Sequence, residues 1–343
     1  MKVHAMAGAA RLSDFQALAQ RSADAGFAGL VVTESGRTAY LSCAAAALSG
    51  ADLDLATGVA VAFPRSPMIT ASIAWELAEA TKGRFRLGLG TQVRAHIERR
   101  YSSEFDPPGP RLREYVQALR AIYRAFRGEE PLKYEGEHYN HTLLPAMWSP
   151  GSIRYPDPPI DLAAVNPWML RMTAREADGV HVHPLNTPTY YADTLLPSLA
   201  SADRDLSSFA IFVPLFTVVG DSDEERSQWR ELSRTQVSFY GSTPNYAFIF
   251  EQLGFEGTTD KIRTAQKQGD IAGMAAVITD DILEHFIVEG SWDELPQRIV
   301  DRCAPLAVHD VQPVLYLAAM SAGDQEKYAR FGDIARRVGA LTA

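Results

Sequence analysis

Short apolar runs alternate with longer amphipathic stretches along the first third of the chain. A strand buried on both faces is apolar throughout, whereas a helix repeats its apolar residues every three or four positions. The expected strands are KVHAM (2–6), FAGLVV (27–32), LDLATGVAVAF (53–63) and RFRLGLG (84–90). The expected helices are SDFQALAQRSADAG (13–26), YLSCAAAAL (40–48), MITASIAWELAEAT (68–81) and RLREYVQALRAIYRAFR (111–127). Such strands joined by helices indicate a parallel sheet.

The alternation breaks twice and then resumes. Residues 128–159 are rich in Pro, aromatic residues and His and predict a long excursion with a small hairpin, and residues 237–281 predict a mostly helical insertion. Further strands are expected at IDLAAV (160–165), DGVHVHP (178–184), FAIFVPLFTVVG (209–220) and VQPVLYLA (311–318). Eight strands alternating with helices favour an α/β fold, a (β/α)8 TIM barrel forming a single domain over 1–343. A doubly wound sheet is the alternative, but the first turn lacks its G-x-G-x-x-G signature.

Charge and composition narrow the function classes. A net charge of −9 argues against nucleic-acid binding, which needs a basic stripe. Cys43 and Cys303 lie in apolar contexts without metal-type spacing, so we expect buried thiols in a reducing compartment. No apolar run approaches the ~18 residues that span a bilayer. We therefore expect a cytoplasmic protein that binds neither nucleic acid nor membrane.

The carboxyl ends of barrel strands are where ligands bind. In this chain the expected ends are mostly small, apolar or uncharged, with no paired carboxylates and no His cluster; they comprise Ala5–Gly8, Thr33–Ser35, Ala60–Arg65, Gly90–Gln92, Ala164–Asn166, His183–Asn186 and Thr217–Gly220. A hydrolase based on an acid pair or a metal would place its groups there. Small residues and accessible backbone instead suit a flat ring across the barrel mouth. The sequence thus predicts a cofactor that carries its own chemistry, and no metal site.

Four longer sequence segments follow one another in a recognisable order. They are GFAGLVVTES (26–35), TGVAVAFPRSPMITASIAWELAEATKGRFRLGLGTQ (57–92), YEGEHY (134–139) and PPIDLAAVNPWMLRMTAREADGVHVHP (158–184). In this order the chain resembles the luciferase-like monooxygenase superfamily, and most of all its branch that uses the deazaflavin coenzyme F420. The turn Lys82–Phe85 and the Leu-Gly-x-Gly of Leu87–Gly90 match the family's pattern. The resemblance implies a TIM barrel that binds F420, or alternatively FMN, across the strand ends.

The resemblance also assigns residues to the cofactor. The phosphate end is expected near the start of the helix at Pro167, because a helix N-terminus offers amide groups to an anion. The implied cofactor-binding residues are Ala5, Thr33, Gly58, Val59, Gly90, Thr91, Gln92, Ala164, Val165 and Asn166. The family also implies a non-prolyl cis peptide at about Gly58-Val59, with a bulge facing the ring.

Two positions depart from the family's pattern. The second strand ends in Glu34-Ser35, where relatives often have an acid followed by His. Thr91 and Gln92 stand where several F420 dehydrogenases carry a carboxylate. These departures argue against a mechanism of the sugar-phosphate dehydrogenase type.

Glu34 and His183 are the candidate catalytic residues. Glu34 could orient a ring edge or relay a proton, or it could be a rim carboxylate paired with an Arg. His183 could contact substrate or the cofactor phosphate, or it could bond to the backbone at the rim. His181 lies one strand period earlier and points the same way, and His4 is expected to be a core histidine.

Two further groups have open roles. The aromatic residues of the insertion could cap a hydrophobic substrate pocket or form an insertion core or dimer surface; they are Phe239, Tyr240, Tyr246, Phe248 and Phe250. The basic run after the fourth strand could hold an anionic substrate or the acidic tail of F420, or be a solvated loop; it comprises Arg94, His96, Arg99 and Arg100.

The main hypothesis is an F420-dependent oxidoreductase that transfers a hydride between the deazaflavin C5 and a small organic substrate. One alternative is an FMN-dependent two-component monooxygenase served by a separate reductase, and another is a non-catalytic flavin-binding barrel. A metal-dependent hydrolase using His4, His181 and His183 is disfavoured, because alternating His residues without a carboxylate make a poor metal site. A homodimer is expected from the resemblance alone.

Overall fold

The computed structural model describes residues 1–343, except for the side chain of Ala319. Its parallel strands close into a barrel in the order β1-β2-β3-β5-β8-β9-β10-β12, and β12 pairs again with β1. The barrel strands are β1 (His4–Ala7), β2 (Gly29–Val32), β3 (Asp54–Thr57), β5 (Phe85–Gly90), β8 (Ile160–Ala163), β9 (Gly179–His181), β10 (Ala210–Val219) and β12 (Asp310–Leu315). The predicted (β/α)8 barrel is confirmed.

The third barrel strand is interrupted. After β3 comes a cis peptide bond between Gly58 and Val59, and pairing with β5 resumes in the short strand β4 (Ala60–Val61). Ala56 lies opposite Arg86 but Ala60 lies opposite Leu89, so the third strand fits one extra residue into this interval. The cis bond and the bulge expected from the family resemblance are both confirmed.

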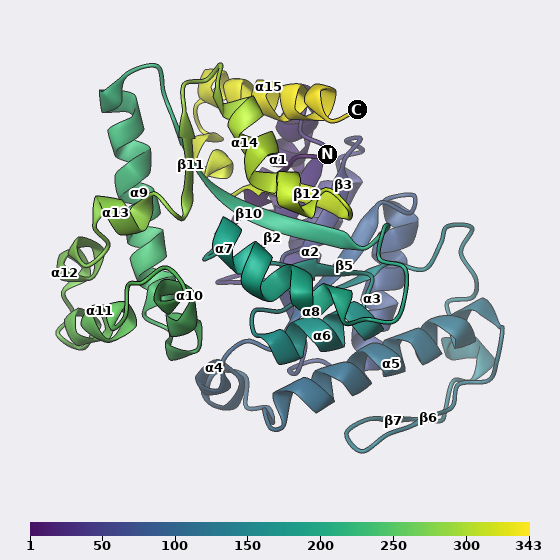
Figure 1. Ribbon diagram of the computed structural model, residues 1–343. Helices are drawn as coiled ribbons and strands as arrows, with labels where there is room; N and C mark the ends of the chain where they lie inside the picture. The colour runs from purple at the N-terminus through teal and green to yellow at the C-terminus, as the bar shows by residue number, and fades with distance from the viewer.

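Helices cover the outside of the barrel (Figure 1). They are α1 (Leu12–Ala25), α2 (Ala39–Leu48), α3 (Pro67–Ala80), α4 (Arg94–Arg99), α5 (Pro108–Arg127), α6 (Pro167–Glu176), α7 (Pro188–Tyr190), α8 (Leu196–Ala200), α14 (Leu295–Cys303) and α15 (Gln325–Leu341), with a π-helical turn, η2 (Tyr191–Leu195), between α7 and α8. Large buried rings fill the layer between helices, as where Trp75 of α3 stacks on Tyr123 of α5 at 5.5 Å. None of the helices in the described part of the chain combines the length and apolarity needed to cross a membrane.

The excursion at 128–159 contains the expected hairpin, formed by β6 (Tyr134–Glu135) and β7 (Asn140–His141), followed by the turn η1 (Ala146–Trp148). Glu114 of α5 fixes this hairpin, because its carboxylate accepts the amide groups of Glu137 and His138 at 3.2 and 2.9 Å. The hairpin lies beside α5, away from the insertion (Figure 1).

The insertion stands off one side of the barrel (Figure 1). It comprises α9 (Asp223–Gly241), η3 (Pro244–Tyr246), α10 (Ala247–Glu251), α11 (Thr258–Lys267), α12 (Ile271–Ala276) and α13 (Asp280–Leu283). Its helical character agrees with expectation, but α9 continues past the expected boundary at 237, because no Gly or Pro interrupts it before Gly241. The chain then forms β11 (Ile287–Gly290), which pairs with the far half of β10 and was not predicted.

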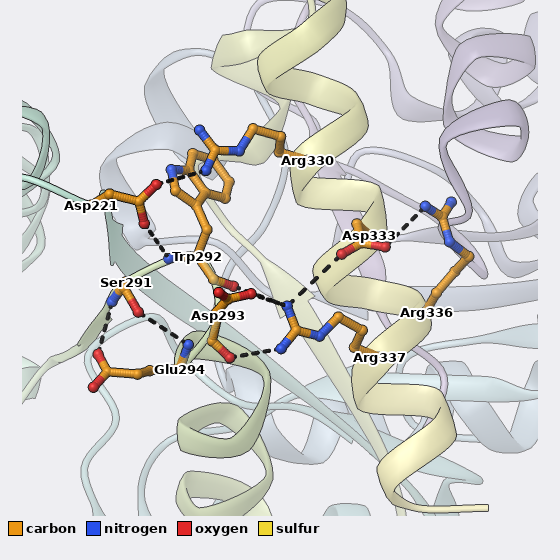
Figure 2. Close-up of polar contacts among 9 residues, drawn as sticks. All are labelled: Asp221, Ser291, Trp292, Asp293, Glu294, Arg330, Asp333, Arg336 and Arg337. Carbon is orange, nitrogen blue, oxygen red and sulfur yellow. Dashed lines mark hydrogen bonds and ion pairs between the residues drawn. The ribbon is translucent and has the colours of Figure 1, made fainter.

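The C-terminal helix α15 is tied to the loop after β11 (Figure 2). Arg330 lies 4.1 Å from the centre of the Trp292 ring and pairs with Asp221 at 3.0 Å. About two turns further along α15, Arg337 pairs with Asp293 at 3.1 Å. The short turns η4 (Ala304–Leu306) and η5 (Ala318–Ser321) flank β12 before this helix begins. These contacts hold the last helix over the side of the barrel where β11 joins β10.

Candidate functional site

The carboxyl ends of the strands carry most of the predicted cofactor residues at accessible positions. Thr33, Gly58, Val59, Thr91 and Val165 are half-buried at these ends, and Gln92 and Asn166 are exposed. Because these residues follow adjacent strands, they share one end of the barrel.

Three other predicted residues are buried. Ala5 packs in the core in the middle of β1 rather than at its end, and Ala164 and Gly90 are also covered. The structure therefore does not bring Ala5 to the mouth, and a cofactor contact at Ala164 or Gly90 stays a prediction.

The Gly-Leu-Gly that ends β5 makes room for neighbouring strands. A Cβ at Gly90 would lie 2.6 Å from Cγ2 of Val59, in the bulge. A Cβ at Gly88 would lie 1.9 Å from the carbonyl oxygen of Thr57 and 2.6 Å from Nε2 of His181. The two glycines thus allow the bulge and the His181 ring to occupy the barrel interior.

His181 is a packing residue inside the barrel. Its ring stacks on Phe212 with centroids 4.4 Å apart and planes 10° apart. Burial, with smaller contributions from Arg86 and His4, lowers the pKa of His181 to about 3, so the ring is neutral. His4 instead pairs with Gln312 at 2.7 Å, as expected of a core histidine. His4 and His181 both pack on the Phe212 ring, with centroids 5.7 and 4.4 Å away.

His183 follows β9 at the mouth and is neutral. Its Nδ1 accepts the amide of Leu185 at 3.1 Å, which places the ring proton on Nε2. Tyr240 and Tyr246 of the insertion contact the ring, with centroids 5.0 and 4.1 Å away. Burial lowers the pKa of His183 to about 3. His183 therefore makes the bond to the rim backbone that one interpretation expected. Its catalytic role stays a prediction.

Tyr240 links the insertion to the barrel. Its hydroxyl is hydrogen-bonded to that of Tyr316, which follows β12 and packs edge-on against Phe216 at 4.9 Å. Burial raises the pKa of Tyr240 and, more strongly, that of Tyr316, so both hydroxyls keep their protons. Tyr316 could not be found from sequence, because nothing in VLYLA distinguishes it from a strand residue.

The remaining aromatic residues of the insertion have other environments. Phe250 is buried against Phe286 at 5.4 Å, and Phe248 approaches Tyr190 at 6.3 Å. Phe239 is 58% exposed. The aromatic group is therefore divided between the insertion's own core, its surface and the contact with His183.

Asn186 is a positioning residue that the sequence did not reveal. It is buried, and its Nδ2 donates to the carbonyls of His183 and Pro214, both at 2.9 Å. Its Oδ1 accepts the hydroxyl of Tyr191, and its backbone carbonyl accepts Arg302 at 2.7 Å. Asn186 therefore fixes the segment carrying His183 onto β10.

Glu34 is fully engaged at the end of β2. One carboxylate oxygen accepts the amide of Val61 at 2.9 Å and Nη1 of Arg65 at 3.1 Å, and the other accepts Nη2 of Arg65. Burial opposes the charge of Arg65, but the bonds to Glu34 and its negative charge raise the pKa of that guanidinium overall. One interpretation of Glu34 was a rim carboxylate paired with an Arg, and Arg65 is that Arg.

The start of α6 offers a place for an anion. Asn166 caps the helix by accepting the amide of Met169 at 2.9 Å, and Pro167 occupies the first position and has no N–H. The amide of Trp168 donates to none of the described residues. Together with the helix dipole, this amide suits a phosphate group.

The basic run after β5 lies on the surface. Arg94 pairs with Glu98 at 3.0 Å and with Asp106, and Arg100 donates to the carbonyl of Ser35 at 2.7 Å. His96 and Arg99 are exposed on α4. The run is thus a solvated helix face, of which one residue reaches the loop that follows Glu34.

Comparison with known proteins finds similar sequences and a similar fold. An uncharacterized protein of Mycobacterium tuberculosis is 35% identical over 90% of this chain and 91% of its own length. The 5,10-methylenetetrahydromethanopterin reductase of Archaeoglobus fulgidus is 27% identical over 80% of this chain and 82% of its own. The structure of coenzyme F420 dependent tetrahydromethanopterin reductase from Methanopyrus kandleri superposes with a TM-score of 0.78 at 18% identity, covering 100% of this chain and 99% of that one.

The family assignment rests on most of the chain. The model of the luciferase-like monooxygenases matches residues 1–310, which include every barrel strand before β12 and the whole insertion. Monooxygenases and the reductases named above are oxidoreductases. The chain belongs to the luciferase-like monooxygenase family.

Proposed function

We propose that this protein is an F420-dependent oxidoreductase that transfers a hydride between the deazaflavin and a small organic substrate. The observation that carries the proposal is the engagement of Glu34 by Arg65 and Val61. With that carboxylate committed, the predicted strand-end residues include no carboxylate left for acid–base chemistry. Protein side chains do not themselves transfer a hydride, so in this proposal the redox chemistry comes from a bound cofactor.

The residues at the mouth fit such a cofactor. The bulge at Gly58 and Val59, with Thr33 on one side and Val165 on the other, gives an uncharged half-buried floor. The amide of Trp168 at the start of α6 would hold the phosphate. When bound, F420 supplies a two-electron hydride-transfer centre.

His183, Tyr240 and Tyr316 are the groups available to handle a proton. His183 carries its proton on Nε2, because Nδ1 is occupied by the Leu185 amide. The hydroxyls of Tyr240 and Tyr316 share a hydrogen bond and keep their protons. We propose that these groups orient a polar atom of the substrate, such as a carbonyl oxygen, and donate to it.

The choice of F420 over FMN is supported by the likeness to the coenzyme F420 dependent reductase of Methanopyrus kandleri. The family's description as monooxygenases supports the FMN alternative, with a separate reductase. Titrating the apo-protein with each cofactor and following ring absorbance separates them. Saturable F420 binding supports the proposal. If F420 binds, hydride exchange with a panel of enones, alcohols and imines separates an enzyme from a non-catalytic binding barrel.

A homodimer and a cytoplasmic location remain part of the proposal, to be tested by light scattering and cell fractionation.

A further inference from the structure

A cavity lies at the amino-terminal ends of the strands, at the opposite end of the barrel from the proposed cofactor site. Its volume is about 460 Å³, within the range of roughly 300–1,000 Å³ typical of small-molecule sites. Its lining comes from the start of β5 and from the residues just before β8, β9 and β10. Three arginines from separate elements, Arg86, Arg120 and Arg204, meet there.

Arg86 is held rigidly by a buried carboxylate. Its Nε and Nη2 donate to the two oxygens of Asp161 at 2.8 and 2.5 Å. Asp161 is completely buried, so this bidentate pair fixes the guanidinium plane. Nη1 of Arg86 donates to none of the described residues.

The other two arginines are held by fewer carboxylate bonds and by backbone carbonyls. Arg120 donates through Nη2 to Asp178 at 3.0 Å and to the carbonyl of Glu176 at 2.8 Å, with Nε also directed at that carbonyl. Arg204 donates to the carbonyls of Ala174 and Ala177, at the end of α6. In both, Nη1 has no acceptor within the described residues.

The carboxylates around the cavity are already engaged. Asp178 accepts the amide of Ile160 at 2.8 Å besides Arg120, and Asp157 accepts Arg127 at 2.8 Å. Asp205 accepts both the amide and the hydroxyl of Ser207, at 2.9 and 3.0 Å. Because these carboxylates already accept other groups, the Nη1 donors of the three arginines remain open to a ligand. Such donors suit a ligand rich in hydrogen-bond acceptors.

Arg204 is the cation with the least compensation. Among the described residues it has no carboxylate within salt-bridge distance, unlike Arg86 and Arg120. Burial, together with the nearby charge of Arg120, lowers its pKa although Asp178 acts in the opposite sense. An anion in the cavity would relieve this repulsion.

We propose that this cavity binds the oxyanion group, phosphate or carboxylate, of a small metabolite through Arg86, Arg120 and Arg204. Guanidinium forks match both groups. Pro159 and the buried Phe209 provide an apolar wall for the rest of the ligand. This site is independent of the proposed redox function, so its test requires no cofactor.

The test is isothermal titration of the full chain with inorganic phosphate and, separately, with succinate, at constant ionic strength. Saturable binding of phosphate alone, succinate alone or both supports the proposal and identifies the group recognised. The Arg204→Gln variant should weaken binding about tenfold or more, because a charge-assisted hydrogen bond is lost. Arg204 contacts only two carbonyls and the Phe209 ring, so this variant should fold, which circular dichroism checks.

Arg298→Gln is the matched control. Arg298 is an exposed arginine of α14 outside the cavity, and its loss changes the net charge equally. It should bind as tightly as the wild type. No saturable binding of either anion, or equal affinities in the Arg204→Gln and Arg298→Gln variants, would overturn the proposal.

Discussion

Glu34 and Arg65 form a nearly buried ion pair across the third barrel strand, with side chains 5% and 20% exposed. The same carboxylate accepts the amide of Val61, two residues after the cis bond. Glu34 therefore ties the end of β2 to the bulge against which a cofactor ring is proposed to lie.

Replacing Glu34 by Gln should lower the free energy of unfolding by roughly 1–3 kcal/mol, since it leaves a poorly hydrated guanidinium without its counter-charge. Urea unfolding measures the loss. Glu98→Gln, which removes the exposed partner of Arg94, should change stability by less than about 0.5 kcal/mol. If Glu34→Gln left stability unchanged and abolished only turnover, Glu34 would be a catalytic residue after all.

Gly88→Ala should destabilise the barrel by about 2 kcal/mol or more, because the new Cβ would meet the fixed carbonyl oxygen of Thr57 at 1.9 Å. Thermal unfolding would detect the change. Gly323→Ala is the control, since its Cβ would meet nothing within 4 Å. A Gly88→Ala protein as stable as the control would mean that the third and fourth barrel strands can separate freely at this point.

Asn186→Ala should cost about 2–4 kcal/mol, because it leaves the carbonyls of His183 and Pro214 and the hydroxyl of Tyr191 without buried partners. It should also alter the proposed substrate contact by releasing the His183 segment. Unfolding by urea, with hydride exchange as a second readout, checks both effects. Wild-type stability would contradict the positioning role.

Stability should fall in acid through the buried histidines. The folded-state pKa of His183, about 3, lies below the ordinary histidine value of 6.5. The unfolded chain therefore binds more protons between these values, so stability decreases as the pH falls from 6.5 toward 3. His183→Asn should reduce the loss between pH 7 and pH 5 by about 1–2 kcal/mol. Asn can still accept the Leu185 amide, and the exposed His96→Asn serves as the control. If the wild type and His183→Asn lost the same stability between pH 7 and pH 5, the destabilising protons would bind at residues other than His183.

The barrel was predictable because unalternated apolar runs of Val, Ile and Leu specify parallel strands with both faces buried. The position of the cis bond at Gly58 followed from the family resemblance. β11 was missed because IVEG contains a charged residue and is not a continuous apolar run, and its partner is the distant half of β10. Short pairings between remote segments carry little local signal.

The site was less predictable, since its geometry depends on contacts between distant residues. Arg65 is 31 positions from Glu34, and Tyr316 is 76 positions from Tyr240. Glu34 and Arg65 meet because β2 pairs with β3, and Tyr240 and Tyr316 meet because the insertion packs against the end of β12. The contact of Gly90 with Val59 depends on the bulge and was not foreseen, and the approach of a ring to Gly90 stays a prediction.

The central claim is that F420 binds at the carboxyl ends of the strands, over the bulge and the start of α6. The most direct measurement is an absorbance titration of the apo-protein with F420 and, in parallel, with FMN. The account predicts saturable binding of F420 and no tight binding of FMN. Tight binding of FMN without any binding of F420 would contradict it.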